Sequence, residues 1–356
     1  AEQESISITG SQAQVHYGDT IQLVATGGTG AGNVTWKVEA KDGSAIASTI
    51  SATGLLTVRD VGGPLVVTVT RSRGGNYADV SAKWEFSAAQ KPVTAVLTAA
   101  DRSYIAGDKT ATVTAAVPES ELVSGDSVII GNLTGMFDTE SVGTAKKVTV
   151  DRSNLNITGI NSDKYTVTIP ETTTASILAA AATVDTDPTP YTLTYDASRE
   201  QKLVTAGAVT GGTMVYSLDD ANYTPAIPEA KDAGTYTVYF KAKGDGNHTD
   251  SEVNSVQVTI SKQTVTPQIE VTPPSAQYDG NVKRPEVIVR DGTNNVIPES
   301  EYTVVYDTVT NWKDVGNHTV TVKNIDGGNY DITETNATFR ITITEQNPLE
   351  IVGKPG

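Results

Sequence analysis

One short motif recurs four times in the chain, each time just before a run that alternates apolar and polar residues. It is clearest at residues 232–240, where Asp-x-Gly-x-Tyr leads into apolar residues at every second position. Successive side chains of a β-strand point to opposite faces, so Tyr236, Val238 and Phe240 would share one face. The four copies are Asp60-Val61-Gly62, Ser141-Val142-Gly143, Asp232-Ala233-Gly234 and Asp314-Val315-Gly316. The motif therefore indicates a series of similar units, each with the same corner.

Two further landmarks keep a nearly constant distance from each corner. A tyrosine precedes the corner glycine by 45, 39, 39 and 38 residues (62 − 17, 143 − 104, 234 − 195 and 316 − 278), and an aromatic residue follows it. The preceding residues are Tyr17, Tyr104, Tyr195 and Tyr278, and the following pairs are Asn76-Tyr77, Lys164-Tyr165, Asn247-His248 and Asn329-Tyr330. Three ordered landmarks at regular spacing predict four repeats of about 89 residues each (356/4).

The residue pattern predicts an all-β fold. Thr and Val are frequent, turn residues come at short intervals, and no long stretch has the apolar period of a helix. In immunoglobulin-like sandwiches a corner tyrosine ties the incoming loop to the start of a strand. We therefore predict four tandem immunoglobulin-like β-sandwich domains in an elongated array, with a β-grasp fold for some repeats as the alternative. The domains would span residues 1–89, 90–178, 179–262 and 263–346, named repeats one to four below, and residues 347–356 would be a linker or begin a further repeat.

The strand register predicts which side chains fill the cores. In repeat three, Tyr236, Val238 and Phe240 would point inward, because Val238 stands where antibody domains carry a cysteine two residues after the corner tyrosine. Val320 and Val322 would do so in repeat four. In repeat one, Trp36 would lie on a central strand and pack the core. Residues 179–182 would form a linker or a first edge strand.

Charge and composition exclude several classes of protein. The net charge of −16 disfavours nucleic acid and anionic membranes as partners. No apolar run is long enough to span a bilayer, and the first residues lack the features of a signal peptide. The sequence contains no cysteine, which is compatible with exported Gram-positive proteins and with reduced cytosol.

Several stretches resemble tandem repeats of bacterial surface proteins. The run VTWKV…GLLTV…VTVTRSRGGNYADV in repeat one resembles bacterial Ig-like domains, and SGDSV…GMFD…VGTAKKVTV in repeat two resembles the YDG repeat, with its name-giving tripeptide reduced to Tyr104-Ile105-Ala106. The run YDASREQKLVTAGAVTGGTMVYSLD in repeat three and the run YDGNVKRPEVIVRDG in repeat four resemble MBG and related Ig-like repeats. These resemblances imply an adhesin or a cell-wall-anchored protein and supply no catalytic residue.

The residues that could carry acid–base catalysis are few. The histidines are His16, His248 and His318; two of them occupy landmark positions that hold tyrosine in other repeats. We interpret them as aromatic substitutes in a structural repeat. The sequence therefore predicts no enzyme, no catalytic residue and no cofactor-binding residue.

Oxygen-rich turns are the candidates for calcium. They are Asp245 and Asn247 with Asp250, Asp326 with Asp331, and Asp185 with Asp187. Asp, Asn and Gly are also favoured in β-turns for backbone reasons, and the twelve-residue calcium loop is absent. We therefore predict turns, with no metal site and no cofactor.

Two kinds of surface chemistry remain open. Asn33, Asn132 and Asn247 begin Asn-x-Ser/Thr sequences, which we interpret as accidents of composition. Trp312, Tyr223 and Trp84 could stack on sugars, and packing at repeat junctions is the favoured alternative. Nothing marks a Lys–Asn isopeptide pair.

These observations favour a non-catalytic segment of a bacterial cell-surface or secreted protein. It would act as an adhesin or stalk, and its possible binding partners are a glycan or a host surface protein. It would be monomeric and extracellular, and it would bind neither nucleic acid nor a membrane. The alternative is an accessory binding or spacer region of a large extracellular carbohydrate-active enzyme. The two differ in whether a cell-wall anchor or a catalytic domain is encoded beside this segment.

Overall fold

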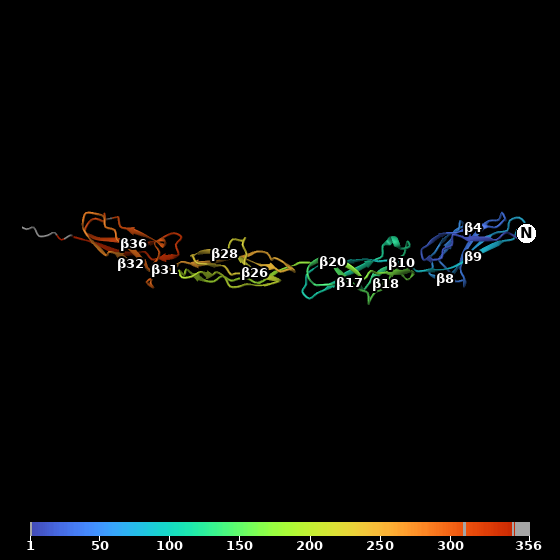
Figure 1. Cartoon of the computed structure of the whole chain (residues 1–356), viewed down its shortest axis with the longest axis horizontal. Coiled ribbons are helices and arrows are strands. Elements are labelled where there is room, and N and C mark those ends of the chain that lie inside the picture. Colours follow the sequence, from blue (N-terminus) through green and yellow to red (C-terminus); the bar gives the residue numbers. More distant parts are fainter. Residues whose placement is uncertain (1, 309–310, 344, 346–356) are drawn as a thin grey trace, which may run out of the picture. The chain divides into compact units, whose positions relative to one another are not determined.

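The computed structural model describes residues 2–308, 311–343 and 345 (Figure 1). It divides the chain into two compact units, residues 1–180 and residues 181–356. Repeats one and two lie in the first unit, and repeats three and four in the second. The predicted further repeat at residues 347–356 lies outside the described residues.

The described residues contain strands and no α-helix. The only helical turns among them are three short 3₁₀ segments, η1 (Glu119–Glu121), η2 (Ser162–Lys164) and η3 (Glu299–Glu301). A β-grasp fold packs a helix of several turns on its sheet, so within the described residues the sandwich describes the repeats better. The prediction of an all-β tandem sandwich protein is confirmed.

Repeat one is a sandwich of two layers. Its strands are β1 (Ile6–Thr9), β2 (Val15–His16), β3 (Thr20–Gln22), β4 (Val24–Gly27), β5 (Val34–Ala40), β6 (Thr49–Ile50), β7 (Leu55–Thr57), β8 (Gly62–Arg71) and β9 (Val80–Ala89). One layer has the order β2-β9-β8-β5, with β2 parallel to β9; the other contains β3-β7-β6 and the pair β1-β4. Ile21 and Leu56 of one layer and Val67 of the other share one buried cluster.

The structure corrects one part of the prediction for Trp36. Trp36 packs against the core of repeat one, as predicted, but it remains partly exposed. Its strand β5 is the outer strand of its sheet and pairs only with β8 among the described strands, so the predicted central position is wrong. A sequence pattern shows which face of a strand is buried and carries little information on its neighbours.

Repeat two has two sheets and two buried clusters. Its strands are β10 (Lys91–Thr94), β11 (Val96–Ala99), β12 (Arg102–Ser103), β13 (Thr110–Ala111), β14 (Val113–Ala116), β15 (Ile129–Gly131), β16 (Thr134–Phe137), β17 (Gly143–Asp151), β18 (Asn156–Thr158), β19 (Tyr165–Thr168) and β20 (Thr172–Leu178). The sheets are β11-β14-β15-β18 and β12-β20-β17-β16-β13, and β10 pairs in parallel with β19. The larger cluster surrounds Phe137 and Val148, and the smaller one surrounds Val93 and Tyr165.

Repeat three is built on the long strand that follows the best corner motif. Its strands are β21 (Ala180–Ala181), β22 (Thr183–Thr186), β23 (Leu193–Thr194), β24 (Gln201–Lys202), β25 (Ala208–Thr210), β26 (Gly212–Ser217), β27 (Glu229–Ala230), β28 (Gly234–Gly244), β29 (His248–Thr249) and β30 (Asn254–Ser261). The main sheet has the order β23-β30-β28-β26, and β22-β25 and β24-β27 form the smaller pairs. Leu203, outside the main sheet, and Val238 within it belong to one cluster, so the core lies between these layers.

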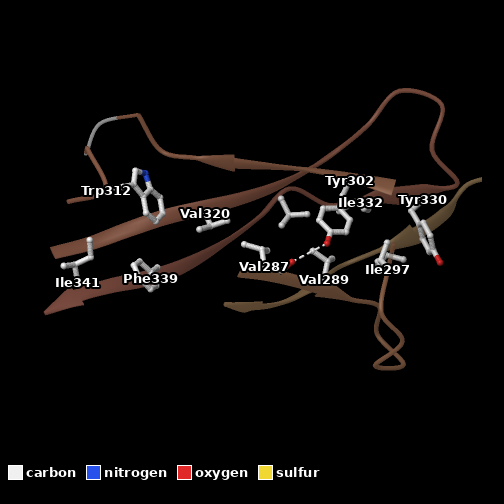
Figure 2. Close-up of a cluster of buried hydrophobic side chains, with 12 residues drawn as sticks. Val287, Val289, Ile297, Tyr302, Trp312, Val320, Tyr330, Ile332, Phe339 and Ile341 are labelled. Atoms are coloured by element: carbon white, nitrogen blue, oxygen red, sulfur yellow. Dashed lines mark hydrogen bonds between the residues drawn. The ribbon is translucent and has the colours of Figure 1, made fainter. Parts of the chain in front are cut away.

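Repeat four follows the same plan. Its strands are β31 (Gln263–Val265), β32 (Gln268–Thr272), β33 (Ser275–Gln277), β34 (Glu286–Arg290), β35 (Tyr302–Tyr306), β36 (Gly316–Asn324), β37 (Tyr330–Ile332) and β38 (Thr335–Thr342). The sheet β33-β38-β36-β35 is accompanied by β32-β34 and by the parallel pair β31-β37. Figure 2 shows the buried cluster of repeat four, with Trp312 and Tyr330 at opposite ends of it.

The corner prediction is confirmed in detail. Val238 and Phe240 are buried, Tyr236 is partly buried against the same cluster, and the Tyr236 hydroxyl donates to the backbone oxygen of Asp232 at 2.8 Å. Val320 and Val322 are fully buried in repeat four. His318 Nε2 lies 2.9 Å from the backbone oxygen of Asp314, the same four-residue spacing. The imidazole thus takes the place of the corner phenol.

Candidate functional site: the junctions between repeats

The three histidines lie in different repeats, and each makes a local contact. His248 Nδ1 lies 2.8 Å from the Asp245 carboxylate within one turn, and His318 is buried in its corner. The backbone amide of His16 donates to Asp19 in a turn at the start of repeat one. Each histidine thus has a local structural contact, and the described residues contain no group of three or more His, Asp, Glu or Cys that could hold a metal ion.

Several carboxylates of the calcium candidates are engaged by donors. Asp250 lies 3.0 Å from Lys241 Nζ and 3.2 Å from Lys243 Nζ, and hydrogen bonds from these two lysines lower its pKa to about 2. Asp185 accepts hydrogen bonds from Thr183 and Thr210. Two lysine ammonium groups thus lie on the Asp250 oxygens that a cation would use, and the neighbouring turn is closed by the His248 amide, which donates to the backbone oxygen of Asp245 at 3.3 Å.

The aromatic candidates for sugar stacking differ in exposure. Trp312 is only 2% exposed, and its Nε1 donates to the backbone oxygen of Asp307 at 2.9 Å. It is a core residue of repeat four and presents no ring face to a sugar. Trp84 stacks on Phe86 at 4.5 Å, and Lys241 Nζ lies 4.8 Å from the ring centre of Tyr223.

The landmarks of repeats one and two meet at one junction. Tyr17 and Tyr165 pack edge to face, with ring centres 5.5 Å apart and planes at 82°. Both hydroxyls donate to the same oxygen of Asp126, at 2.7 Å from Tyr17 and 2.6 Å from Tyr165. Lys164 Nζ donates to the backbone oxygen of Arg59, next to the corner of repeat one, and lies 5.1 Å from the Tyr17 ring centre. The tyrosine landmark of repeat one and the aromatic landmark of repeat two therefore contribute to one contact, next to the corner of repeat one.

Hydrogen bonds at this junction stabilise the ionised form of the Asp126 carboxyl group. Desolvation opposes its ionisation, but hydrogen bonds from Asn161, Tyr165 and Tyr17 outweigh desolvation and lower the pKa of Asp126. On the other side of the contact, burial and the Asp126 bond raise the pKa of Tyr165 to about 12. The junction is thus most stable with an ionised carboxylate and two neutral phenols.

We expect the contribution of Asp126 to depend on pH. Its folded pKa is below the ordinary value of 3.8, so its stabilisation is complete above that value and is lost as the pH falls through the lowered pKa. The ring resonances of Tyr17 and Tyr165, followed by NMR from neutral pH to about pH 2, should report the change. In the Asp126→Asn variant the transition should vanish at the cost of about 1–2 kcal/mol of stability. An identical titration in this variant would contradict the assignment.

Repeats three and four are joined in the same way. Tyr195 and Tyr330 pack edge to face, with ring centres 5.3 Å apart and planes at 75°. Asn329 accepts from the backbone amide of Ala233, at the corner of repeat three, at 2.6 Å. Its side-chain amide donates to Asp232 at 3.2 Å and to Glu301 at 3.0 Å.

A hollow lies at this junction. A cavity of about 790 Å³ is lined by residues of both repeats, among them Tyr195, Lys231, Asp291 and Tyr330. The Asp291 carboxylate is buried and accepts hydrogen bonds from Thr293 and Asn295. The Asp291 carboxylate therefore stabilises its own turn.

The sequence pattern indicates the landmarks but not the residues that accept their hydrogen bonds. Nothing in the landmark spacing points to Asp126 or Glu301, although one other signal is present. The tetrapeptide Pro-Glu-Ser-Glu occurs at residues 118–121 and 298–301, and in both places it forms a 3₁₀ turn. Glu301 lies in the second copy, which positions it beside Asn329.

The match to a known family coincides with the second of these repeats. Residues 89–175 match the YDG domain family. The match begins just before β10, ends within β20 and includes Asp126 and Tyr165. The YDG segment thus contributes both the acceptor and the second phenol of the first junction. Comparison with curated proteins finds no match.

Solved structures with related architecture overlap only loosely. Sidekick-1 immunoglobulin domains 1–5 give a TM-score of 0.27 at 12% identity, covering 96% of this chain and 78% of that one. The fibronectin(III)-like modules of Clostridium thermocellum CbhA give 0.18 at 17% identity, covering 48% and 99%. SGBP-B of Bacteroides ovatus, solved with a mixed-linkage heptasaccharide, gives 0.16 at 13%, covering 95% and 70%. At such TM-scores the fold assignment rests on the strand order described above.

The β-sandwich repeats described above are those of a tandem-repeat protein. Immunoglobulin-like and YDG-type domains are typically non-catalytic. Among the described residues, no helix has the length and apolar character needed to cross a membrane.

Proposed function

We propose that this chain is a non-catalytic segment of a bacterial cell-surface or secreted protein, acting as an adhesin or stalk. Its location would be extracellular, at the cell surface or cell wall. The observation that carries the proposal is the repeated junction. Specific side-chain contacts between neighbouring domains would hold a stalk extended, and both described junctions have a tyrosine pair and partly buried polar anchors.

The surface chemistry supports the same function. The net charge of −16 keeps a long Thr-rich chain soluble and is unfavourable for nucleic acid. Binding of a glycan or a host surface protein would then fall to loops at the ends of the sandwiches, as is common for β-sandwich domains. An accessory region of an extracellular carbohydrate-active enzyme would use the same features, and the coding sequence beside this segment distinguishes the two.

Small-angle scattering tests the stalk. We expect an elongated monomer with a maximum dimension on the order of 150 Å, taking about 35–40 Å for each of four sandwiches. Substitution of Tyr17 and Tyr195 by alanine should broaden the distance distribution, because the junctions lose their central contacts. A compact particle would rule out the stalk, and an elongated distribution unchanged by both substitutions would show that the tyrosine contacts do not hold the repeats in line.

A binding screen tests adhesion. Immobilised full chain should retain a glycan or a mucin-type glycoprotein weakly, and turnover of these glycans should be absent. The matched control is the same chain unfolded in denaturant and captured at equal density. Turnover of any glycan by the purified chain would contradict the proposal, and retention of none would restrict the function to that of a spacer.

A further inference from the structure

Tyr17 belongs to repeat one by sequence, but its side chain is buried in repeat two. It is only 2% exposed, and every other member of its buried cluster comes from repeat two. These members are Val93, Ala95, Val117, Tyr165 and Ile169. The smaller core of repeat two is therefore completed by a residue of the preceding domain.

The backbone around Tyr17 is shaped for this insertion. Gly18 has a φ of +88°, and a Cβ atom there would lie 2.7 Å from Val123 Cγ2 of repeat two. A larger residue would therefore force the two repeats apart. The Val123 amide in turn donates to the Tyr165 hydroxyl at 2.8 Å, so the segment that meets Gly18 also fixes the second phenol.

The second unit repeats the insertion. Tyr195 of repeat three packs against the buried cluster of its own repeat and also against that of repeat four. Tyr330, the first residue of β37, receives it, as Tyr165, the first residue of β19, receives Tyr17. In both repeats this strand pairs in parallel with the first strand, β10 or β31. The two junctions thus share the edge-to-face tyrosine pair and the strand that receives it, and they differ in their polar contacts.

We propose that repeats two and four each carry a tyrosine socket, an interaction surface that binds one tyrosine side chain of the preceding repeat. That side chain is Tyr17 for repeat two and Tyr195 for repeat four. The socket consists of the edge-on tyrosine at the start of β19 or β37, the apolar residues around it and a polar anchor. The anchor is Asp126 in repeat two, and Asn329 with Glu301 in repeat four. Because the inserted ring packs against the neighbour's core, the stability of the receiving repeat depends in part on the repeat before it.

The socket predicts an effect across a domain boundary. Replacing Tyr17 by alanine leaves a cavity in the small core of repeat two, which contains no substitution, and removes one donor from Asp126. Local opening of β10 and β19 should therefore become more frequent. Replacing Tyr17 by phenylalanine keeps the ring and removes only the hydroxyl, so its effect should be smaller.

Hydrogen exchange of the full chain, read by mass spectrometry, tests the socket. In Tyr17→Ala, amides of β10 and β19 should exchange about tenfold faster or more, with Tyr17→Phe intermediate and residues 181–343 unchanged. In Tyr195→Ala the faster amides should lie in β31 and β37. Tyr77→Ala, at a partly exposed tyrosine of repeat one outside the clusters, is the matched control and should leave β10 and β19 unchanged.

The outcomes that overturn the proposal are distinct. Faster exchange confined to residues 2–89 in Tyr17→Ala would make Tyr17 a residue of its own domain. Unchanged exchange in both Tyr17→Ala and Tyr195→Ala would remove the socket. If Tyr17→Ala proves too unstable to measure, Tyr17→Phe decides by the same criterion.

Discussion

The Val238→Asp variant should lose the structure of repeat three while repeats one and two keep theirs. Val238 is fully buried beside Phe240 and Val258. A carboxylate placed there is surrounded by apolar side chains, so the cost should exceed about 4 kcal/mol. A small domain has a total stability of only about 5–15 kcal/mol, so the substitution removes most of it.

The state of repeat four in this variant distinguishes separate from paired repeats. If each core were independent, repeat four would be unaffected. With the tyrosine socket, unfolding of repeat three withdraws Tyr195, so repeat four should stay folded but exchange faster around β37. Limited proteolysis and hydrogen exchange of the full chain would show the order of loss.

Thr235→Asp is the matched control. Thr235 lies on the same strand as Val238 but on the exposed face, so the same charge should cost less than about 0.5 kcal/mol there. If all four repeats of the Val238→Asp variant unfolded in a single transition, both the hypothesis of independent repeats and the tyrosine-socket hypothesis would be contradicted.

The register of the long strands could be read from the sequence because it depends only on local alternation. Val238, Phe240, Val320 and Val322 are buried as the period-two pattern predicts. The corner was equally local, since the Tyr236 hydroxyl reaches a carbonyl four residues away. Such short-range geometry is determined by bond lengths and backbone sterics.

The junction could not be read in this way. The Tyr17 and Asp126 side chains meet across 109 residues of sequence, and an isolated aspartate in a loop has no pattern that distinguishes it. The regular spacing of the landmarks is visible in the sequence, but by itself it predicts only the framework of each domain. In the structure, part of that spacing serves the contact between domains, because a residue at the end of one sandwich must reach the start of the next.

Trp312 shows why loop residues mislead. It follows no alternating pattern and has a φ of +59°, in the left-handed region, so its surroundings resemble an exposed loop. The ring nevertheless turns inward and packs with Tyr306 at 5.1 Å and with His318 at 4.8 Å. The sequence indicated the loop correctly but not the direction of its side chain.

The Trp312→Ala variant should unfold or severely destabilise repeat four. The indole lies at one end of the core in Figure 2, stacks on Phe339 at 6.1 Å and covers the corner imidazole of His318. Its removal leaves a large cavity at the point where His318 holds the corner, so we expect a loss of about 3–5 kcal/mol. Denaturant unfolding followed by circular dichroism should show an early transition for about a quarter of the chain.

A neighbouring substitution separates the ring from the loop. Lys313→Ala changes an exposed residue of the same loop and should leave the unfolding curve within about 0.5 kcal/mol of the unsubstituted chain. The tyrosine socket adds a second expectation: when Trp312→Ala unfolds repeat four, Tyr195 loses its cover, so β23 and β30 of repeat three should exchange faster. Normal exchange in repeat three together with an unfolded repeat four would show that the tyrosine contact stabilises only the repeat that receives it.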